Sequence, residues 1–328
     1  MTDTRQIVHE GESVPKTTSL QRQLRLIWDR YGIFIILMFF AIVLTLMTDR
    51  FLTAQNLLNV ARQVSVLALI SLGLLVVIIT GNVDLTVGAF MGLAGALFAG
   101  WSKQFGVAPA LLMGFGIALA MGLNNGFLAT RGKGLSVIVT LAMLMICQGI
   151  TLLYTNGRPI IGFPDSMRVI GTGYVGPIPW PVVIALLAAL TVHVLLRYTT
   201  YGRELYAIGG NPEAARLSGI PVKLRVTTAF VISSLLSAVA SLVLIARVSS
   251  AQPTAGVGDE FTAVGAVLIG GASLSGGAGT VVKTLAGVLI LGMISNGLNL
   301  MQVNPFYQYV VKGLIILLAI LMDQWGRK

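Results

Sequence analysis

The chain has 328 residues, of which 55% are hydrophobic and 10% are charged, and its mean hydropathy is +0.87. Soluble proteins carry about a quarter of their residues as charged side chains to cover their surface. The composition therefore excludes a soluble enzyme and predicts an all-α polytopic integral membrane protein. The net charge of +10 is spread over tails and loops, whereas a nucleic-acid-binding surface would gather it into one soluble basic patch.

Ten apolar runs approach or reach the roughly 20 helical residues that cross a bilayer core about 30 Å thick. The runs are Tyr31–Met47, Val64–Thr80, Gly88–Trp101, Val107–Ala129, Leu135–Tyr154, Pro181–Leu196, Val226–Ala246, Phe261–Leu274, Val281–Leu298 and Phe306–Met322. The sequence thus predicts about ten transmembrane helices. The third and eighth runs are short, and we expect each of them to be tilted, broken or partly re-entrant.

The distribution of Lys and Arg over the short loops predicts the orientation of the chain. Most of these residues lie on one side when the N-terminus is placed inside, so the positive-inside rule predicts that both termini are cytoplasmic. This division gives a cytoplasmic tail over 1–30, a transmembrane domain over 31–323 with a long cytoplasmic loop over 197–225, and a short tail over 324–328. The first tail lacks the apolar core of a signal peptide.

Motifs for catalysis, nucleotide binding and metal binding are missing from the sequence. The letters LSGGA from Leu274 resemble the LSGGQ signature of ABC ATPases, but no GxxxxGK[ST] phosphate loop accompanies them. We therefore predict a tight glycine turn there. No HExxH motif or histidine pair is present, Cys147 is a single cysteine within a span, and His193 ends an apolar run. The sequence predicts no catalytic or metal-binding residue and no cofactor in this chain.

Ionisable residues inside the predicted spans are few, which argues against ion-driven transport. Asp84 is the carboxylate closest to a span, and it can either serve an ion pathway or cap the helix that follows. Lys312, within the tenth span, is the other candidate for a charge inside the membrane. Alternatively, its long aliphatic stem could carry the ammonium group to the membrane surface. So little buried charge favours a pathway for an uncharged polar solute.

Two pairs of polar stretches predict an internal repeat. The stretch NVDLTVGAFMGLAGAL from Asn82 resembles GDEFTAVGAVLIGGASL from Gly258, and GLNNGF from Gly122 resembles ISNGLN from Ile294. Each pair is separated by five spans, and an odd separation inverts the topology. We therefore predict an inverted repeat that relates spans 2–5 to spans 7–10.

Amide side chains inside the apolar runs are costly unless they find a partner or face water. They hold neighbouring helices together under one interpretation and line the path of a hydroxyl-rich solute under the other. With Asp84, the candidate pathway residues are Asn125, Gln148, Asn296 and Asn299.

The long polar loop contains a short predicted helix. Asn211 or Pro212 can begin it, Glu213 lies favourably in its first turn, and Gly219 can end it. A short helix held between two spans suits docking into a partner's groove.

The same loop carries a resemblance to a known family. Glu213-Ala214-Ala215 followed by Gly219 resembles the EAA-xxx-G coupling motif of ABC importer permeases. NVDLTVG from Asn82, YTNGRPI from Tyr154, AIGGNPEAARLSGI from Ala207, SSAQPTAG from Ser249 and NGLNLM from Asn296 resemble stretches of the ribose-type monosaccharide permease family. The chain departs from that family where Asn82 replaces a usual glycine and Pro212 a common glutamate.

The resemblance implies a permease subunit in the bacterial inner membrane that imports ribose or a similar pentose or hexose. It implies a second permease copy, a periplasmic sugar-binding protein, and a separate ABC ATPase chain that binds ATP and Mg. The residues it assigns to ATPase coupling are Asn211, Glu213, Ala214, Ala215, Arg216 and Gly219. Two alternatives are an ion-coupled sugar carrier, which would need a carboxylate such as Asp84, and a membrane enzyme acting on lipid-linked sugars.

Overall fold

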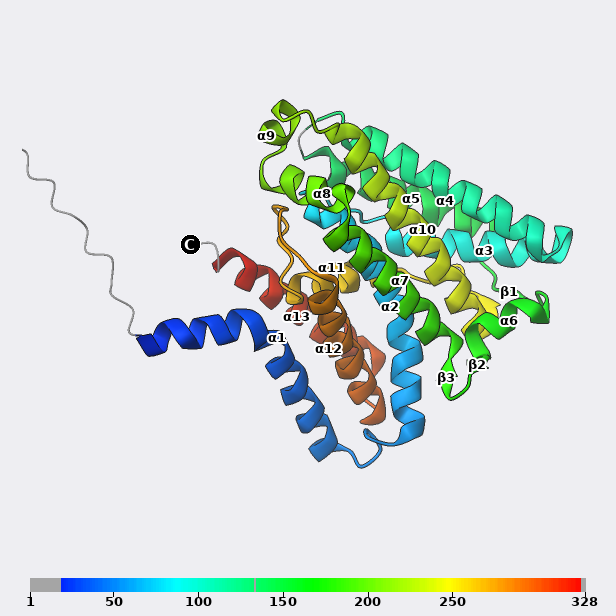
Figure 1. Ribbon diagram of the computed structural model, residues 1–328. Coiled ribbons are helices and arrows are strands. Elements are labelled where there is room, and N and C mark those ends of the chain that lie inside the picture. The colour runs from blue at the N-terminus through cyan, green and yellow to red at the C-terminus, as the bar shows by residue number, and fades with distance from the viewer. Residues whose placement is uncertain (1–18, 133, 326–328) are drawn as a thin grey trace, which may run out of the picture.

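The computed structural model describes residues 19–132 and 134–325 of the chain, and helices dominate it (Figure 1). The helices are α1 (Ser19–Met47), α2 (Ala54–Ile79), α3 (Val87–Phe105), α4 (Val107–Ala129), α5 (Leu135–Thr155), α6 (Asp165–Thr172), α7 (Trp180–Tyr198), α8 (Thr200–Gly210), α9 (Pro212–Leu217), α10 (Val222–Val248), α11 (Asp259–Ile269), α12 (Val281–Leu300) and α13 (Pro305–Trp325). Strands β1 (Ile160–Ile161) and β4 (Ser250–Ala251) form one antiparallel pair, and β2 (Tyr174–Val175) and β3 (Ile178–Pro179) form another. The predicted all-α polytopic architecture is therefore confirmed.

Each of the ten predicted apolar runs lies on a helix, but the helices differ in their ability to cross a membrane. Six of them, α2, α4, α5, α7, α10 and α12, are long and apolar enough to do so. Helix α1 and helix α13 contribute shorter apolar stretches, Tyr31–Met47 and Pro305–Leu318. At a rise of 1.5 Å per residue, the 19 residues of α3 extend about 28 Å and the 11 residues of α11 only about 16 Å. The eighth span is thus too short to cross alone.

Several helix ends differ from the apolar runs that predicted them. Helix α1 begins at Ser19, inside the segment expected to be a tail, and α2 begins at Ala54, ten residues before the run that starts at Val64. The Thr53 hydroxyl caps α2 by accepting a hydrogen bond from the backbone N–H of Asn56. Polar residues occupy the first turns of both helices, so hydropathy alone does not reveal where they begin.

The packing pairs agree with the predicted internal repeat, in which α2–α5 correspond to α10–α13. Helix α10 packs against α3 and α4, just as α2 packs against α11 and α12. Helix α3 contacts α4 and α5, just as α11 contacts α12 and α13. The central pair, α2 and α10, contact each other.

Helices α3 and α11 begin side by side and then run to opposite sides of the molecule. A Cβ atom on Gly88, in the first turn of α3, would lie 2.1 Å from Glu260 Oε2 and 2.3 Å from Gly256 O. Near its other end α3 reaches β1, where Lys103 Nζ donates to Ile161 O at 2.9 Å. Helix α11 ends instead beside the start of α12, because a Cβ on Gly270 would lie 2.8 Å from the backbone of Lys283 and Thr284. Opposite directions from a shared start are what an inverted repeat requires.

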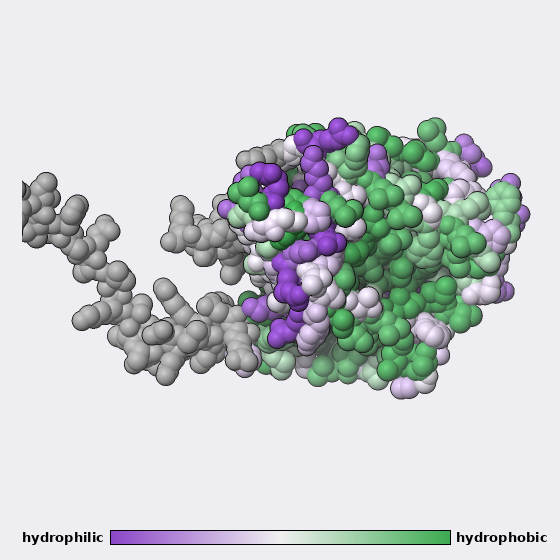
Figure 2. Space-filling model, turned by 45° about the horizontal axis from the view of Figure 1, so that its top comes forward, coloured by the Kyte–Doolittle hydropathy of each residue, from purple (hydrophilic) through white to green (hydrophobic). Residues whose placement is uncertain are grey.

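The apolar core is centred on α2, and the outer helices turn apolar faces outward. Within the most apolar part of each helix, 83% of α2 is buried but only 22% of α5. Figure 2 shows a broad hydrophobic surface, with hydrophilic residues gathered toward one side of the view. So large an exposed apolar surface would drive a soluble protein to aggregate, whereas lipid covers it at no such cost.

Small residues allow the central helices to approach closely. A Cβ on Gly122 of α4 would lie 2.4 Å from Val231 Cα of α10, and a Cβ on Gly126 would lie 2.5 Å from Thr227 Cα. Both distances are shorter than real side chains tolerate, so only glycine fits. Close backbone contact is the main source of helix association in lipid.

Candidate functional site

The predicted loop helix is present as α9, and local hydrogen bonds define its ends. Asn211 Oδ1 accepts from the backbone N–H groups of Glu213 and Ala214, both at 3.0 Å. At the other end, Gly219 has φ of +85°, which favours glycine, and Ile220 N donates to Ala215 O at 3.1 Å. These caps confirm that the helix begins after Asn211 and ends before Gly219.

Helix α9 presents charged and apolar side chains to the exterior. The Glu213 carboxylate and the Arg216 guanidinium lie 2.6 Å apart, and the two side chains are 66% and 62% exposed. An exposed ion pair of this kind contributes only about 0–1 kcal/mol to stability. Leu217 is 73% exposed, whereas Ala215 is buried. The helix thus has an inner face that packs and an outer face suited to docking.

Helix α8, which precedes α9, is fixed to three other parts of the chain. Glu204 forms a half-buried ion pair with Arg225 at the start of α10. Tyr206 Oη donates to Gly279 O at 2.7 Å, in the 270–280 loop that joins α11 to α12. A Cβ on Gly209 would lie 1.9 Å from Ile79 O at the end of α2 and 2.2 Å from Gly277 N. Helix α8 therefore connects α9 to α2, α10 and the 270–280 loop through direct contacts.

Tyr201 secures the same junction. Its hydroxyl donates to Arg225 O at 3.3 Å and accepts from Thr228 Oγ1 at 3.1 Å, and both partners lie on α10. Burial raises the pKa of Tyr201 from its ordinary value of 10.0 to about 12, although the Thr228 hydrogen bond and the Arg225 charge oppose that shift. The tyrosine is consequently neutral at physiological pH.

The glycine-rich letters from Leu274 form a turn, as predicted. Gly276 N donates to Ser273 O at 2.9 Å, and Gly276 and Gly277 both have positive φ. Gly277 N also donates to Ile79 O at 2.9 Å. The turn thus forms part of the seat on which α8 rests.

Two of the predicted pathway residues, Asp84 and Asn125, belong to one buried polar network. Asp84 Oδ1 accepts from Thr86 N at 3.1 Å and from the Thr86 hydroxyl, while Oδ2 accepts from Ser233 Oγ of α10 at 2.8 Å. Asn125 Nδ2 of α4 donates to Thr86 Oγ1 at 3.0 Å. The carboxylate lies at the start of α3, where the helix dipole favours negative charge. This network ties α3 to α4 and α10.

The other three predicted pathway residues lie apart from this network. Asn296 of α12 and Asn56 of α2 exchange two hydrogen bonds of 2.9 Å between their amides. Asn299 Oδ1 accepts from Gln308 Nε2 of α13 at 2.8 Å. Gln148 is half-buried on α5, away from both pairs. Four of the five candidates therefore make hydrogen bonds between helices or between a helix and the start of another. Such contacts fit the interpretation in which these polar residues hold neighbouring helices together.

Sequence reasoning missed the partners in these contacts. Asn56 lies in the polar start of α2, outside the apolar run, and Ser233 is one of several serines on α10. Ser233, Ser237 and Ser241 are all fully buried. Their spacing of four residues places them on one helix face, and this polar stripe was the available signal. Among the residues that the structure describes, no three His, Cys, Asp or Glu side chains gather as metal ligands do.

Comparisons with known proteins assign the chain to a family. A family model described as "Branched-chain amino acid transport system / permease component" matches residues 56–320. The ribose import permease protein of Bacillus subtilis is 44% identical over 318 residues, which cover 94% of this chain and 98% of that protein. Its Escherichia coli counterpart is 39% identical over 319 residues, with the same coverage.

A further relative is named for another sugar. The L-arabinose transport system permease protein of Escherichia coli is 34% identical over 327 residues, which cover 97% of this chain and 96% of that protein. No solved structure matches the chain. The chain therefore belongs to this family of membrane-spanning permease components, which includes the ribose-type ABC importer permeases, and it is a transport permease subunit.

Proposed function

We propose that this permease subunit imports a neutral monosaccharide, ribose or a similar pentose or hexose, across the bacterial inner membrane. The observation that carries the proposal is the likeness, along nearly the whole chain, to permeases named for ribose and arabinose. The sparse charge of the spans suits an uncharged solute, because ionic substrates need compensating charges within the membrane.

An ABC importer permease works with an ATPase chain and a substrate-binding protein, which the family implies as partners here. We assign ATPase docking to the outer face of α9, with Glu213 and Arg216 as its charged contacts and Asn211, Ala214, Ala215 and Gly219 as the residues that shape it. In this arrangement ATP and Mg bind to the ATPase chain. Both termini are cytoplasmic, and a second copy of this permease completes the membrane core.

The contacts of α8 supply the mechanical link in this proposal. When the ATPases close, they push on α9, and α8 passes the displacement to the end of α2, the start of α10 and the 270–280 loop. Helix α2 packs against α3 and α11, and α10 packs against α3. The starts of α3 and α11 meet inside the molecule. A small displacement at the α9 face thus reaches the interior without crossing a flexible connection.

Reversing one charge on α9 tests the coupling assignment. We expect Glu213→Lys to reduce ATP-driven uptake of labelled D-ribose into proteoliposomes that hold the permease with its ATPase and binding-protein partners. The matched control is Asp165→Lys, because Asp165 forms an equivalent exposed pair with Arg168 three residues later and lies on α6, at a different end of the molecule from α9 (Figure 1). Copurification of the ATPase measures docking directly.

The outcomes separate the competing functions. Loss of uptake and of ATPase copurification in Glu213→Lys alone supports docking on α9, whereas full activity contradicts it. Ribose uptake by the permease alone, driven by an ion gradient, would instead support the ion-coupled carrier. The hydrogen bonds to both oxygens of Asp84 favour a structural role for this carboxylate over a mobile proton carrier.

A further inference from the structure

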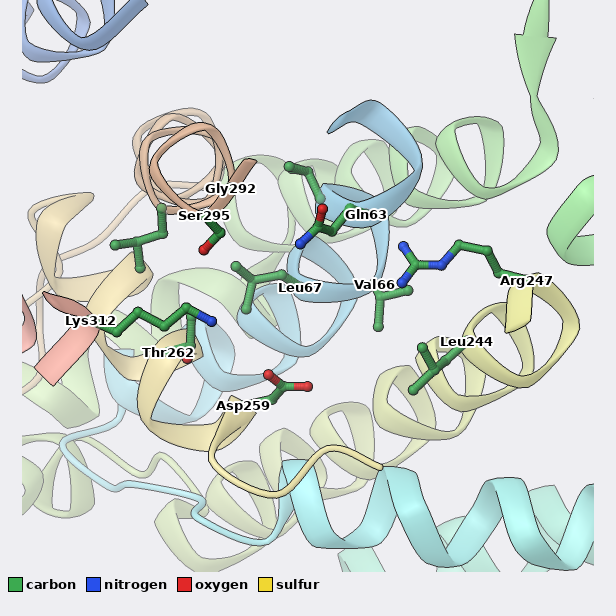
Figure 3. Close-up of a pocket in the computed structure, with 12 residues that line it drawn as sticks. Gln63, Val66, Leu67, Leu244, Arg247, Asp259, Thr262, Gly292, Ser295 and Lys312 are labelled. Atoms are coloured by element: carbon green, nitrogen blue, oxygen red, sulfur yellow. The ribbon is translucent and has the colours of Figure 1, made fainter. Parts of the chain in front are cut away.

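A cavity of about 140 Å³ lies among α2, α10, α11, α12 and α13. Six polar side chains line it, and they are Gln63, Arg247, Asp259, Thr262, Ser295 and Lys312. Figure 3 shows these side chains arranged around a common space, which they enter from different helices. At about 30 Å³ per water in the liquid, the cavity holds on the order of five waters, which suits one small polar solute.

The charged groups at this cavity lack direct partners. Within the described part of the chain, Arg247, Asp259 and Lys312 form no ion pair within 4.0 Å and no side-chain hydrogen bond. Charged groups inside a membrane protein are expensive unless they are paired or solvated. Their cost points to a polar occupant of the cavity.

The hydroxyl of Ser295 gives a second, independent indication. Ser295 is only 7% exposed, yet its hydroxyl makes no hydrogen bond to any residue that the structure describes. Its Oγ is not sealed inside the protein, because it is open to the cavity that Ser295 lines. Helical serines usually satisfy themselves by donating to the carbonyl four residues earlier, so Ser295 is free to bond a solute in the cavity.

The lining fits a polyhydroxylated neutral molecule best. Each sugar hydroxyl can donate and accept, so a carboxylate, a guanidinium, an ammonium and a hydroxyl can all bond to one ring. The aliphatic walls from Val64, Leu67 and Leu244 can contact its C–H faces. Two cations against one carboxylate disfavour a metal ion or a proton-linked cation.

We propose that this cavity binds the monosaccharide during its passage, with Asp259 and Arg247 as the main charge-assisted contacts to sugar hydroxyls. The inference rests on the proposed function and adds a location within the membrane domain. The site is also linked to coupling, because Asp259 begins α11 and the 270–280 loop that seats α8 follows the end of the same helix.

Protection of an introduced thiol tests the site in the full-length permease in nanodiscs. Ser295→Cys adds a thiol to a chain whose one native cysteine, Cys147, is fully buried. We expect D-ribose, at ten times its half-maximal concentration, to slow labelling by methyl methanethiosulfonate about tenfold. Adding Asp259→Asn should raise the D-ribose concentration that gives half-maximal protection about tenfold, since it removes one charge-assisted hydrogen bond. The control pair, Ser295→Cys with Asp165→Asn, should behave like Ser295→Cys alone.

A second reporter, Thr262→Cys, keeps the test decisive if the first variant does not fold. Protection by ribose 5-phosphate or by sodium chloride, without protection by D-ribose, would overturn the inference in favour of an ion site. Ribose uptake by the unmodified importer is measured separately. Normal uptake with no protection at either thiol overturns this location alone, whereas no sugar uptake by the unmodified importer overturns the proposed function as well.

Discussion

The seat of α8 on the end of α2 can be disturbed by a single methyl group. In Gly209→Ala, the new Cβ would lie 1.9 Å from Ile79 O and 2.2 Å from Gly277 N, where ordinary contact requires at least 3.4 Å. Both obstructing atoms are backbone, so no side-chain rotation relieves the clash. The same methyl group crowds the 2.9 Å hydrogen bond from Gly277 N to Ile79 O. Helix α8 must therefore move away from its seat.

The magnitude follows from three contributions. Overpacking costs about 1–3 kcal/mol, and loss of the hydrogen bond costs about 1 kcal/mol. Alanine returns up to about 1 kcal/mol through its higher helix propensity. We therefore expect Gly209→Ala to lower the free energy of unfolding by about 1–4 kcal/mol. ATP-driven uptake should fall as well, because α8 no longer transmits displacement.

Gly210→Ala is the matched control. A Cβ on Gly210 would meet nothing within 4 Å, and its φ is not in the positive range, although it is the next residue of the same helix. Thermal unfolding, followed by tryptophan fluorescence of the purified permease, should show a midpoint a few degrees lower for Gly209→Ala only. Equal midpoints and equal uptake for the two variants would refute the proposed role of this contact.

Two further predictions concern the polar pairs. Asn296→Ala should lower the free energy of unfolding by about 1–3 kcal/mol, because it leaves the buried Asn56 Oδ1 without its donor, although Asn56 Nδ2 still donates to Phe51 O. The double variant Asn56→Leu with Asn296→Leu should recover part of that loss in the same thermal assay, and no recovery would contradict the pairing. The raised pKa of Tyr201 predicts an alkaline instability: the unfolded chain releases this proton above about pH 10 and the folded chain only near pH 12, so stability falls between these values. Tyr201→Phe should flatten that fall in a pH series of midpoints, and an unchanged slope would exclude Tyr201 as its source.

Helix positions were predictable because burial in lipid depends on the length of an apolar run. The start of α2 was not, because Asn56 pairs with Asn296, 240 residues away, whereas hydropathy treats Asn56 as a residue that ends a span. The early start of α2 is thus a tertiary effect. The end of α11 was missed for a local reason. Its apolar run continued to Leu274, although the helix ends at Ile269. Glycines 270 and 271 follow, and the second has φ of +76°.

The predictability of the candidate sites also depended on whether the contacts that define them are local or long-range. Helix α9 was predictable because Asn211, Glu213 and Gly219 act on backbone groups within a few residues. The cavity was not, because its charges come from α10, α11 and α13 and meet only in the fold. Lys312 attracted notice as a lone charge in a span, whereas its relation to Asp259 became visible only in the structure.

Helix α11 connects the two proposals. With 11 residues it extends only about 16 Å, so its first residue reaches the cavity while its last residue leads into the loop that seats α8. Helix α8 contacts the 270–280 loop, from which α11 gives a covalent route of one short helix to Asp259. It also contacts Ile79 at the end of α2, and Asp84 follows in the connection to α3. Gly209→Ala should therefore change the protection of the Ser295→Cys thiol by D-ribose as well as uptake, although Gly209 and Ser295 lie on separate elements.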